Sequence, residues 1–177
     1  MIFASHPHDR GTTMPSTSSV RAHLIAGACA AAFLLGSVAG QAQTGPFAPL
    51  GGAWAGTGTI KLVEGGTERI RCKASYDLVS HSQVNLNLTC ASDSYKFVLL
   101  GSMEASSGGT ITGNWTEQTR SVAGVVSGRV TGNHIAVTTA GALNATLSLT
   151  SAGATQSIVL KSKGTSIEQM SISMKRG

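Results

Sequence analysis

The 177-residue chain has few aromatic side chains, since phenylalanine, tyrosine and tryptophan together make up 5 % of it. That scarcity argues against two classes of protein, namely nucleic-acid binders that stack bases and outer-membrane barrels with aromatic girdles. Charged residues are also sparse, at 12 %, and the basic ones form no run except Lys175-Arg176. Because nucleic-acid binding normally needs a clustered basic face, we expect no nucleic-acid partner.

Motifs for catalysis and cofactor binding are missing from the sequence as well. It has no serine-centred elbow, no paired-carboxylate pattern and no phosphate-binding loop. His81 and His134 both fall at predicted turns, without a cysteine or an acidic residue at metal-ligand spacing. We therefore expect neither an enzyme nor a bound metal or cofactor, and we assign no catalytic residue.

The chain has a single long hydrophobic run, Leu24 to Val38, which follows Arg21 and precedes small residues. This pattern is typical of a bacterial signal peptide, and the run is too short to span a bilayer comfortably. We predict a signal peptide over residues 1–42, with cleavage after Ala42 and with Met14 as an alternative start. The protein is then periplasmic or secreted, and it is not an integral membrane protein.

The mature chain keeps two of the three cysteines, because Cys29 falls inside the predicted signal peptide. An even number of cysteines in an exported chain predicts a disulfide, here between Cys72 and Cys90. The alternative is a redox pair, which usually needs close spacing and a helix N-terminus, and the sequence offers neither. A leader over residues 43–50 precedes a single domain over residues 51–177.

Two segments, Arg69–Tyr76 and Val84–Cys90, alternate polar and apolar residues with a period of two. Alternation of this kind predicts β-strands with one buried and one exposed face. In both segments the cysteine lies on the apolar face, so a hairpin would set Cys72 opposite Cys90.

Similar short runs, separated by glycine, asparagine, aspartate or serine, continue to the end of the chain. This spacing is typical of a β-sandwich or β-barrel. The predicted strands are Ala53–Val63, Thr67–Val79, Val84–Ala91, Tyr95–Ala105, Thr110–Gln118, Ser121–Thr131, His134–Thr139, Leu143–Thr150, Gln156–Lys163 and Ile167–Lys175. We predict an all-β fold, an up-and-down antiparallel barrel of eight to ten strands.

The turns allow the strand register to be predicted. A turn over residues 64–66 can pair Ile60 with Ile70 and Trp54 with Tyr76. Across a two-residue turn the inward residues change from even to odd numbers. The apolar pattern changes in this way at positions 93–94 and 132–133, which predicts such turns there.

The other face of the strands is rich in threonine, serine and asparagine. Two kinds of barrel fit this pattern: a soluble one with an apolar interior, and an outer-membrane one with an apolar exterior. We favour the soluble barrel, because aromatic girdles, alternating long loops and an aromatic terminal strand are absent from the sequence.

The segment Gly52-Ala-Trp54 resembles the Gly-x-Trp signature of lipocalins and their calycin relatives. The resemblance implies that Trp54 plugs one end of the barrel and that Arg176, or Lys175, packs on it. Gly109–Trp115 is loosely similar to an avidin strand. The chain departs from these families, since it lacks the several tryptophans of an avidin site, a C-terminal helix and the proximal histidine of a nitrobindin-type haem barrel.

Four aromatic residues, Trp54, Tyr76, Phe97 and Trp115, share the inward face of the predicted strands. They either line a ligand pocket or fill the core. Glu117 also has inward parity, and it is either a buried carboxylate with a raised pKa or a solvated residue at the rim.

The leading hypothesis is an exported, soluble calycin-like barrel that binds a small apolar or amphipathic ligand. The alternative is a structural or protein-interaction module of the cell envelope with a filled core and no small-molecule ligand. No particular protein partner is indicated.

Overall fold

The computed structural model describes residues 44–177. The predicted signal peptide and Cys29 lie outside these residues. The described chain has a short 3-10 helix, η1 (Ala48–Leu50), followed by ten strands. The strands are β1 (Gly52–Leu62), β2 (Thr67–Leu78), β3 (Gln83–Ala91), β4 (Lys96–Ala105), β5 (Thr110–Glu117), β6 (Val122–Thr131), β7 (His134–Gly141), β8 (Asn144–Ala152), β9 (Thr155–Lys163) and β10 (Ile167–Arg176).

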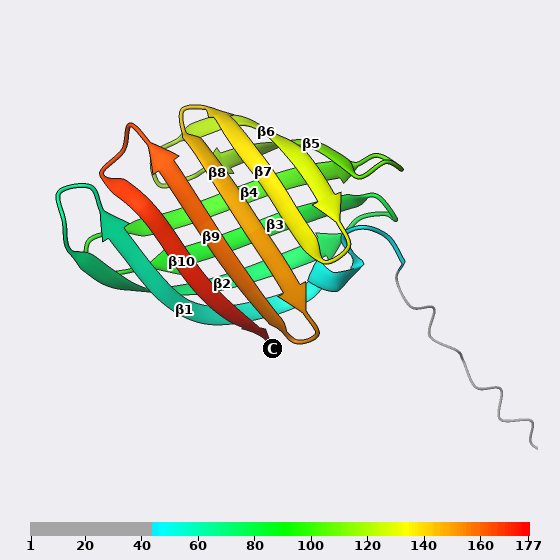
Figure 1. Cartoon of the computed structure of the whole chain (residues 1–177), viewed down its shortest axis with the longest axis horizontal. Coiled ribbons are helices and arrows are strands. Elements are labelled where there is room, and N and C mark those ends of the chain that lie inside the picture. The colour runs from blue at the N-terminus through cyan, green and yellow to red at the C-terminus, as the bar shows by residue number, and fades with distance from the viewer. Residues whose placement is uncertain (1–43) are drawn as a thin grey trace, which may run out of the picture. The chain divides into compact units, whose positions relative to one another are not determined.

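The ten strands form one closed antiparallel barrel, in which each strand pairs with its neighbours in sequence and β10 closes on β1. Strands β7–β10 pass obliquely in front of β2–β5, so the wall of the barrel forms two layers around the core (Figure 1). The predicted fold class is therefore confirmed, and each predicted strand ends within two residues of the observed one.

The core lies inside the barrel. Along β2 the side chains alternate between buried and exposed, with Ile70, Cys72, Ala74 and Tyr76 facing inward. The outward positions of the other strands carry mainly threonine, serine, asparagine and lysine. The barrel therefore has an apolar interior and a polar exterior. No helix in the described part of the chain is long and apolar enough to cross a membrane.

The predicted disulfide is present between Cys72 and Cys90, which face each other across β2 and β3 with their Cα atoms 4.1 Å apart. The two-residue turn at Gly132-Asn133 is confirmed by the pairing of Thr131 with His134. The turn at positions 93–94 is confirmed by a hydrogen bond from Ser92 N to Tyr95 O (2.8 Å).

The predicted register between β1 and β2 is wrong by two residues. Trp54 pairs with Ala74 rather than with Tyr76, and Ile60 pairs with Glu68 rather than with Ile70. The turn closes one residue earlier than expected, because Leu62 N donates to Gly66 O. A shift of two leaves every side chain on its predicted face, so the core is unchanged.

Candidate functional site

One end of the barrel is sealed by the segment that precedes β1. Phe47 and Leu50 are only 1 % and 2 % exposed, and they pack with Trp54 in the core. The indole N–H of Trp54 donates to the carbonyl of Leu50 (2.6 Å). The segment predicted as a leader thus carries two of the most deeply buried side chains of the described chain.

Arg176, at the end of β10, completes this seal. Its guanidinium lies 4.3 Å from the centre of the Trp54 ring, a cation–π distance. The same side chain donates hydrogen bonds to the carbonyls of Gly51 and Pro49, the latter at 2.8 Å. Of the two basic residues predicted to pack on Trp54, Arg176 does so, and the neighbouring Lys175 is exposed.

Near the opposite end, several inward apolar side chains remain half-buried. We call six of them the mouth lining: Leu88, Phe97, Leu99, Leu147, Leu160 and Met170. Register brings them together, because Leu147 pairs with Leu160 and Leu160 with Met170 on adjacent strands, while Leu88 pairs with Leu99. These six inward side chains therefore keep part of their surface exposed.

The sealed half differs, because most of its inward residues are buried. They include Val84, Ile111, Ile135, Leu149 and Met174. Leu78, Leu86 and Met103 are half-buried exceptions in this half. Near the mouth, the inward residues Ile60, Ile70 and Cys90 are buried, so β1 and β2 are packed and the accessible lining belongs to β3, β4 and β8–β10.

An aromatic pair lies at the same end of the barrel, opposite Trp54, which we call the mouth. The rings of Tyr95 and Phe97 stack with their centres 6.0 Å apart, and the Arg120 guanidinium lies 5.1 Å from the centre of Phe97. The hydroxyl groups of Tyr95 and Ser166 lie 3.2 Å apart, which links the β3–β4 turn to the β9–β10 turn. Sequence reasoning named Phe97 but missed Tyr95, although Tyr95 has the same strand parity.

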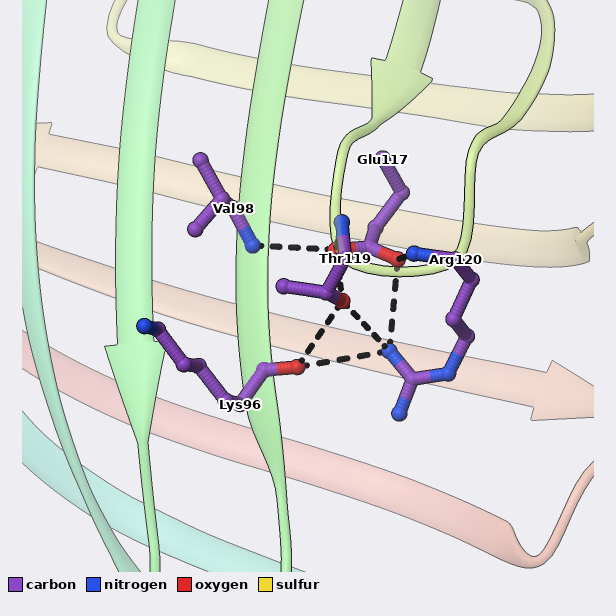
Figure 2. A network of polar contacts seen from close by, with 5 residues as sticks. All are labelled: Lys96, Val98, Glu117, Thr119 and Arg120. Carbon is purple, nitrogen blue, oxygen red and sulfur yellow. Dashed lines mark hydrogen bonds and ion pairs between the residues drawn. The ribbon is translucent and has the colours of Figure 1, made fainter.

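Glu117 lies at the base of the β5–β6 turn, and the interpretation as a solvated rim residue is wrong because it is only 6 % exposed. Its carboxylate accepts hydrogen bonds from the backbone N–H groups of Val98, Thr119 and Arg120, each at 3.0 Å (Figure 2). It also forms an ion pair with the Arg120 guanidinium at 3.3 Å, and that guanidinium donates to Lys96 O.

These contacts determine the charge state of Glu117. Burial alone would raise its pKa, but the hydrogen bonds from Thr119, Val98 and Arg120 outweigh burial and lower the pKa to about 2. Glu117 therefore lacks the raised pKa that is expected of a buried catalytic acid, and its pKa is lowered instead. Glu117 is ionised at neutral pH and anchors the turn to β4.

Two other predicted residues are buried in the core of the barrel. Tyr76 and Trp115 share one inward row across the strands, separated by Leu86 and Gly101. The Trp115 indole N–H donates to Val125 O (3.2 Å). Burial raises the pKa of Tyr76, so its hydroxyl is neutral at physiological pH. The five predicted residues are thus spread along the barrel, with Phe97 among the accessible mouth lining.

Sequence reasoning also missed a polar pair in the interior. Ser151 and Gln156 face each other across β8 and β9 and are 3 % and 2 % exposed. Neither the Ser151 hydroxyl nor the Gln156 amide finds a hydrogen-bond partner among the described residues. The parity of Ile158 could have identified Gln156 as inward. No group of three or more metal-ligating side chains occurs within residues 44–177.

The fold and these two ends define the class of the molecule, a closed ten-stranded barrel with one sealed end. No protein-family model and no curated protein sequence matches the chain. The crystal structure of Rv2717c from M. tuberculosis is similar, with a TM-score of 0.60 and 15 % identity, over 73 % of this chain and 93 % of that one. This likeness shows the fold alone.

A second solved structure, EF1p2_mFAP2b bound to DFHBI, aligns over 73 % of this chain and 94 % of its own. Its TM-score is 0.46, and the sequences are 11 % identical.

Proposed function

We propose that this protein is an exported, water-soluble, lipocalin-like barrel that holds a small apolar or amphipathic molecule in its interior. The observation that carries the proposal is the contrast between the two ends. The Trp54 end is sealed by η1 and Arg176, whereas the mouth lining stays accessible. Binding of a ligand that covers apolar surface inside a barrel is favourable, because it removes that surface from water.

The chemistry of the mouth suits such a ligand. Five of the six lining side chains are aliphatic and the sixth is Phe97, and small-molecule sites are mostly apolar with a few placed polar groups. Polar groups at the rim include the hydroxyl of Tyr95 and the guanidinium of Arg120. An amphipathic molecule would place its apolar part in the interior and its polar part against these two groups.

Export and solubility are supported by three features. The sequence begins with a signal-peptide pattern, the Cys72–Cys90 disulfide is typical of an oxidising compartment, and the outward positions are polar. The Gly-x-Trp segment with its arginine partner supports the lipocalin-like assignment.

The five candidate residues take different roles in this proposal. Phe97 contacts the ligand, Trp54 seals the far end, and Tyr76 and Trp115 fill the core. Glu117 does not contact the ligand, because its carboxylate holds the β5–β6 turn beside Arg120.

The proposal is tested by filling the mouth. Leu160→Trp adds bulk beside Leu147 and Met170, whereas Val125→Trp adds the same side chain at an outward position that is 54 % exposed. We expect the neutral apolar dye Nile red to bind the unmodified protein and the Val125→Trp variant equally. Leu160→Trp should weaken that binding about tenfold or more, a loss equal to about 1.4 kcal/mol.

If Nile red does not bind the unmodified protein, the interior is filled and the envelope module becomes the better proposal. If both tryptophan variants bind the dye as well as the unmodified protein, the dye sits outside the barrel. Should Leu160→Trp fail to fold, as shown by its thermal unfolding, Leu147→Phe provides the same test with less added volume.

A further inference from the structure

Basic residues from β2, β4 and β10 lie near one another on the outer surface of the barrel, around β2. On β2, Arg69, Arg71 and Lys73 alternate with buried residues and are all exposed. Alternate residues of a strand project from the same side at a spacing of about 7 Å. The three cations therefore form a row along the outside of β2.

Two more cations join this row through the strand register. Arg71 pairs with Ala91, which pairs with Lys96 on β4. In the same way Lys73 pairs with Ala55, which pairs with Lys175 on β10, and both lysines are exposed. We call these five residues the basic face: Arg69, Arg71, Lys73, Lys96 and Lys175.

The basic face is not neutralised by the fold. Within residues 44–177, none of its five cations forms an ion pair with another side chain; the ion pairs there are Lys61–Glu168 and Glu117–Arg120. Asp77, four residues beyond Lys73, is the acid on the outward side of β2. The carboxylate of Glu68, beside Arg69 in sequence, accepts hydrogen bonds from Ser92 and Ser94.

The surface between the cations is low. Where a residue separates two of them across the strands, it is an alanine, Ala55 or Ala91, so the long basic side chains are the highest points. No outward residue of β1–β4 is aromatic, which leaves nothing for nucleic-acid bases to stack on. A cluster of cations without ion-pair partners is complementary to a surface of negative charge.

We propose that the basic face docks the protein onto an anionic phospholipid bilayer. The long side chains reach the phosphate groups while the barrel stays outside the hydrocarbon. Each cation near such a surface strengthens binding by about fivefold at moderate ionic strength. The proposal goes beyond ligand binding and does not depend on it, because the contact lies on the outside of the wall.

The test is vesicle binding by the purified protein, with phosphatidylcholine vesicles that contain or lack phosphatidylglycerol. We expect binding only to the anionic vesicles and a steep loss of binding as salt is added. The variant Arg71→Gln/Lys73→Gln should bind about 25-fold more weakly. The matched control is Lys161→Gln/Lys163→Gln, which removes the same charge from exposed positions on β9 and should change binding far less.

Equal losses in the two double variants would overturn the proposal, because net charge alone would then explain the binding. Equal binding to both kinds of vesicle, or tighter binding to duplex DNA than to anionic vesicles, would also overturn it. A second variant of the same face, Arg69→Gln/Lys96→Gln, covers the case in which the first fails to fold. Nile red binding should be unchanged in these variants, which would show that the interior ligand site is intact and that the loss of vesicle binding arises from the basic face.

Discussion

Glu117 shows how a buried charge can be structural. Desolvation normally raises the pKa of a buried carboxylate and marks it as a candidate acid or base. Here three backbone N–H groups and the Arg120 guanidinium all point at one carboxylate. The β5–β6 turn is therefore built around the negative charge of Glu117, which these N–H groups and the Arg120 guanidinium compensate.

Replacing Glu117 by glutamine should lower the free energy of unfolding at neutral pH by about 1–3 kcal/mol, because hydrogen bonds to a charged acceptor are lost. The folded pKa, about 2, lies below the ordinary value of 4.5. The stabilisation is therefore complete above about pH 5 and is lost as the pH falls through about 2. Chemical denaturation across this range should show a smaller acid-induced loss in Glu117→Gln than in the unmodified protein.

The exposed Glu104, on β4, is the control for this substitution, and Glu104→Gln should leave the unfolding free energy unchanged within about 0.5 kcal/mol. Identical stability of Glu117→Gln and the unmodified protein at neutral pH would show that the carboxylate does not hold the turn.

At the scale of elements, the seal depends on the end of one strand. Arg176 reaches from β10 over Trp54 and donates to the carbonyls of Pro49, within η1, and Gly51, directly after it. The backbone of the last residues is also anchored, since Gly177 N donates to Ala53 O (2.9 Å). The first and last strands and the short helix thus stabilise one another.

Arg176→Ala should destabilise the protein by about 1–3 kcal/mol, because a cation–π contact and two charge-assisted hydrogen bonds are lost. Lys175→Ala removes an exposed side chain from the adjacent position and should change stability by less than about 0.5 kcal/mol. Thermal unfolding of the two variants measures the difference. Equal melting temperatures would mean that the seal does not depend on Arg176.

The strands could be predicted because each has one buried face, which produces a period-two pattern in the sequence. The pairing of Cys72 with Cys90 followed from the same parity. The register of β1 on β2 could not be predicted, because it depends on which backbone groups close the Leu62–Gly66 turn. The helix η1 is three residues long, too short to have a period of its own.

Site residues were harder to predict than strands. Parity placed Glu117 inside, but its state depends on backbone N–H groups of a turn and of β4, which no sequence pattern reveals. The basic face was not predicted from the sequence either. Three of its five cations alternate along β2, but only the register of β10, β1, β2, β3 and β4 adds Lys96 and Lys175 to them.

At the scale of the whole described domain, closure removes the strand edges that an open sheet would expose to aggregation. The disulfide adds about 3 kcal/mol on the chain-entropy model, from the loop between Cys72 and Cys90. Packing is then unequal along the barrel, with a sealed half and an accessible half. That inequality is the structural basis of the proposed ligand site.

Native mass spectrometry of the protein recovered from its producing cells, compared with its denatured mass, tests the ligand site most directly. We expect a native mass above that of the bare chain, with the excess lost on denaturation and absent from Leu160→Trp. A native mass equal to that of the bare chain would contradict the proposed function and would mean that the mouth lining is covered by nothing but water.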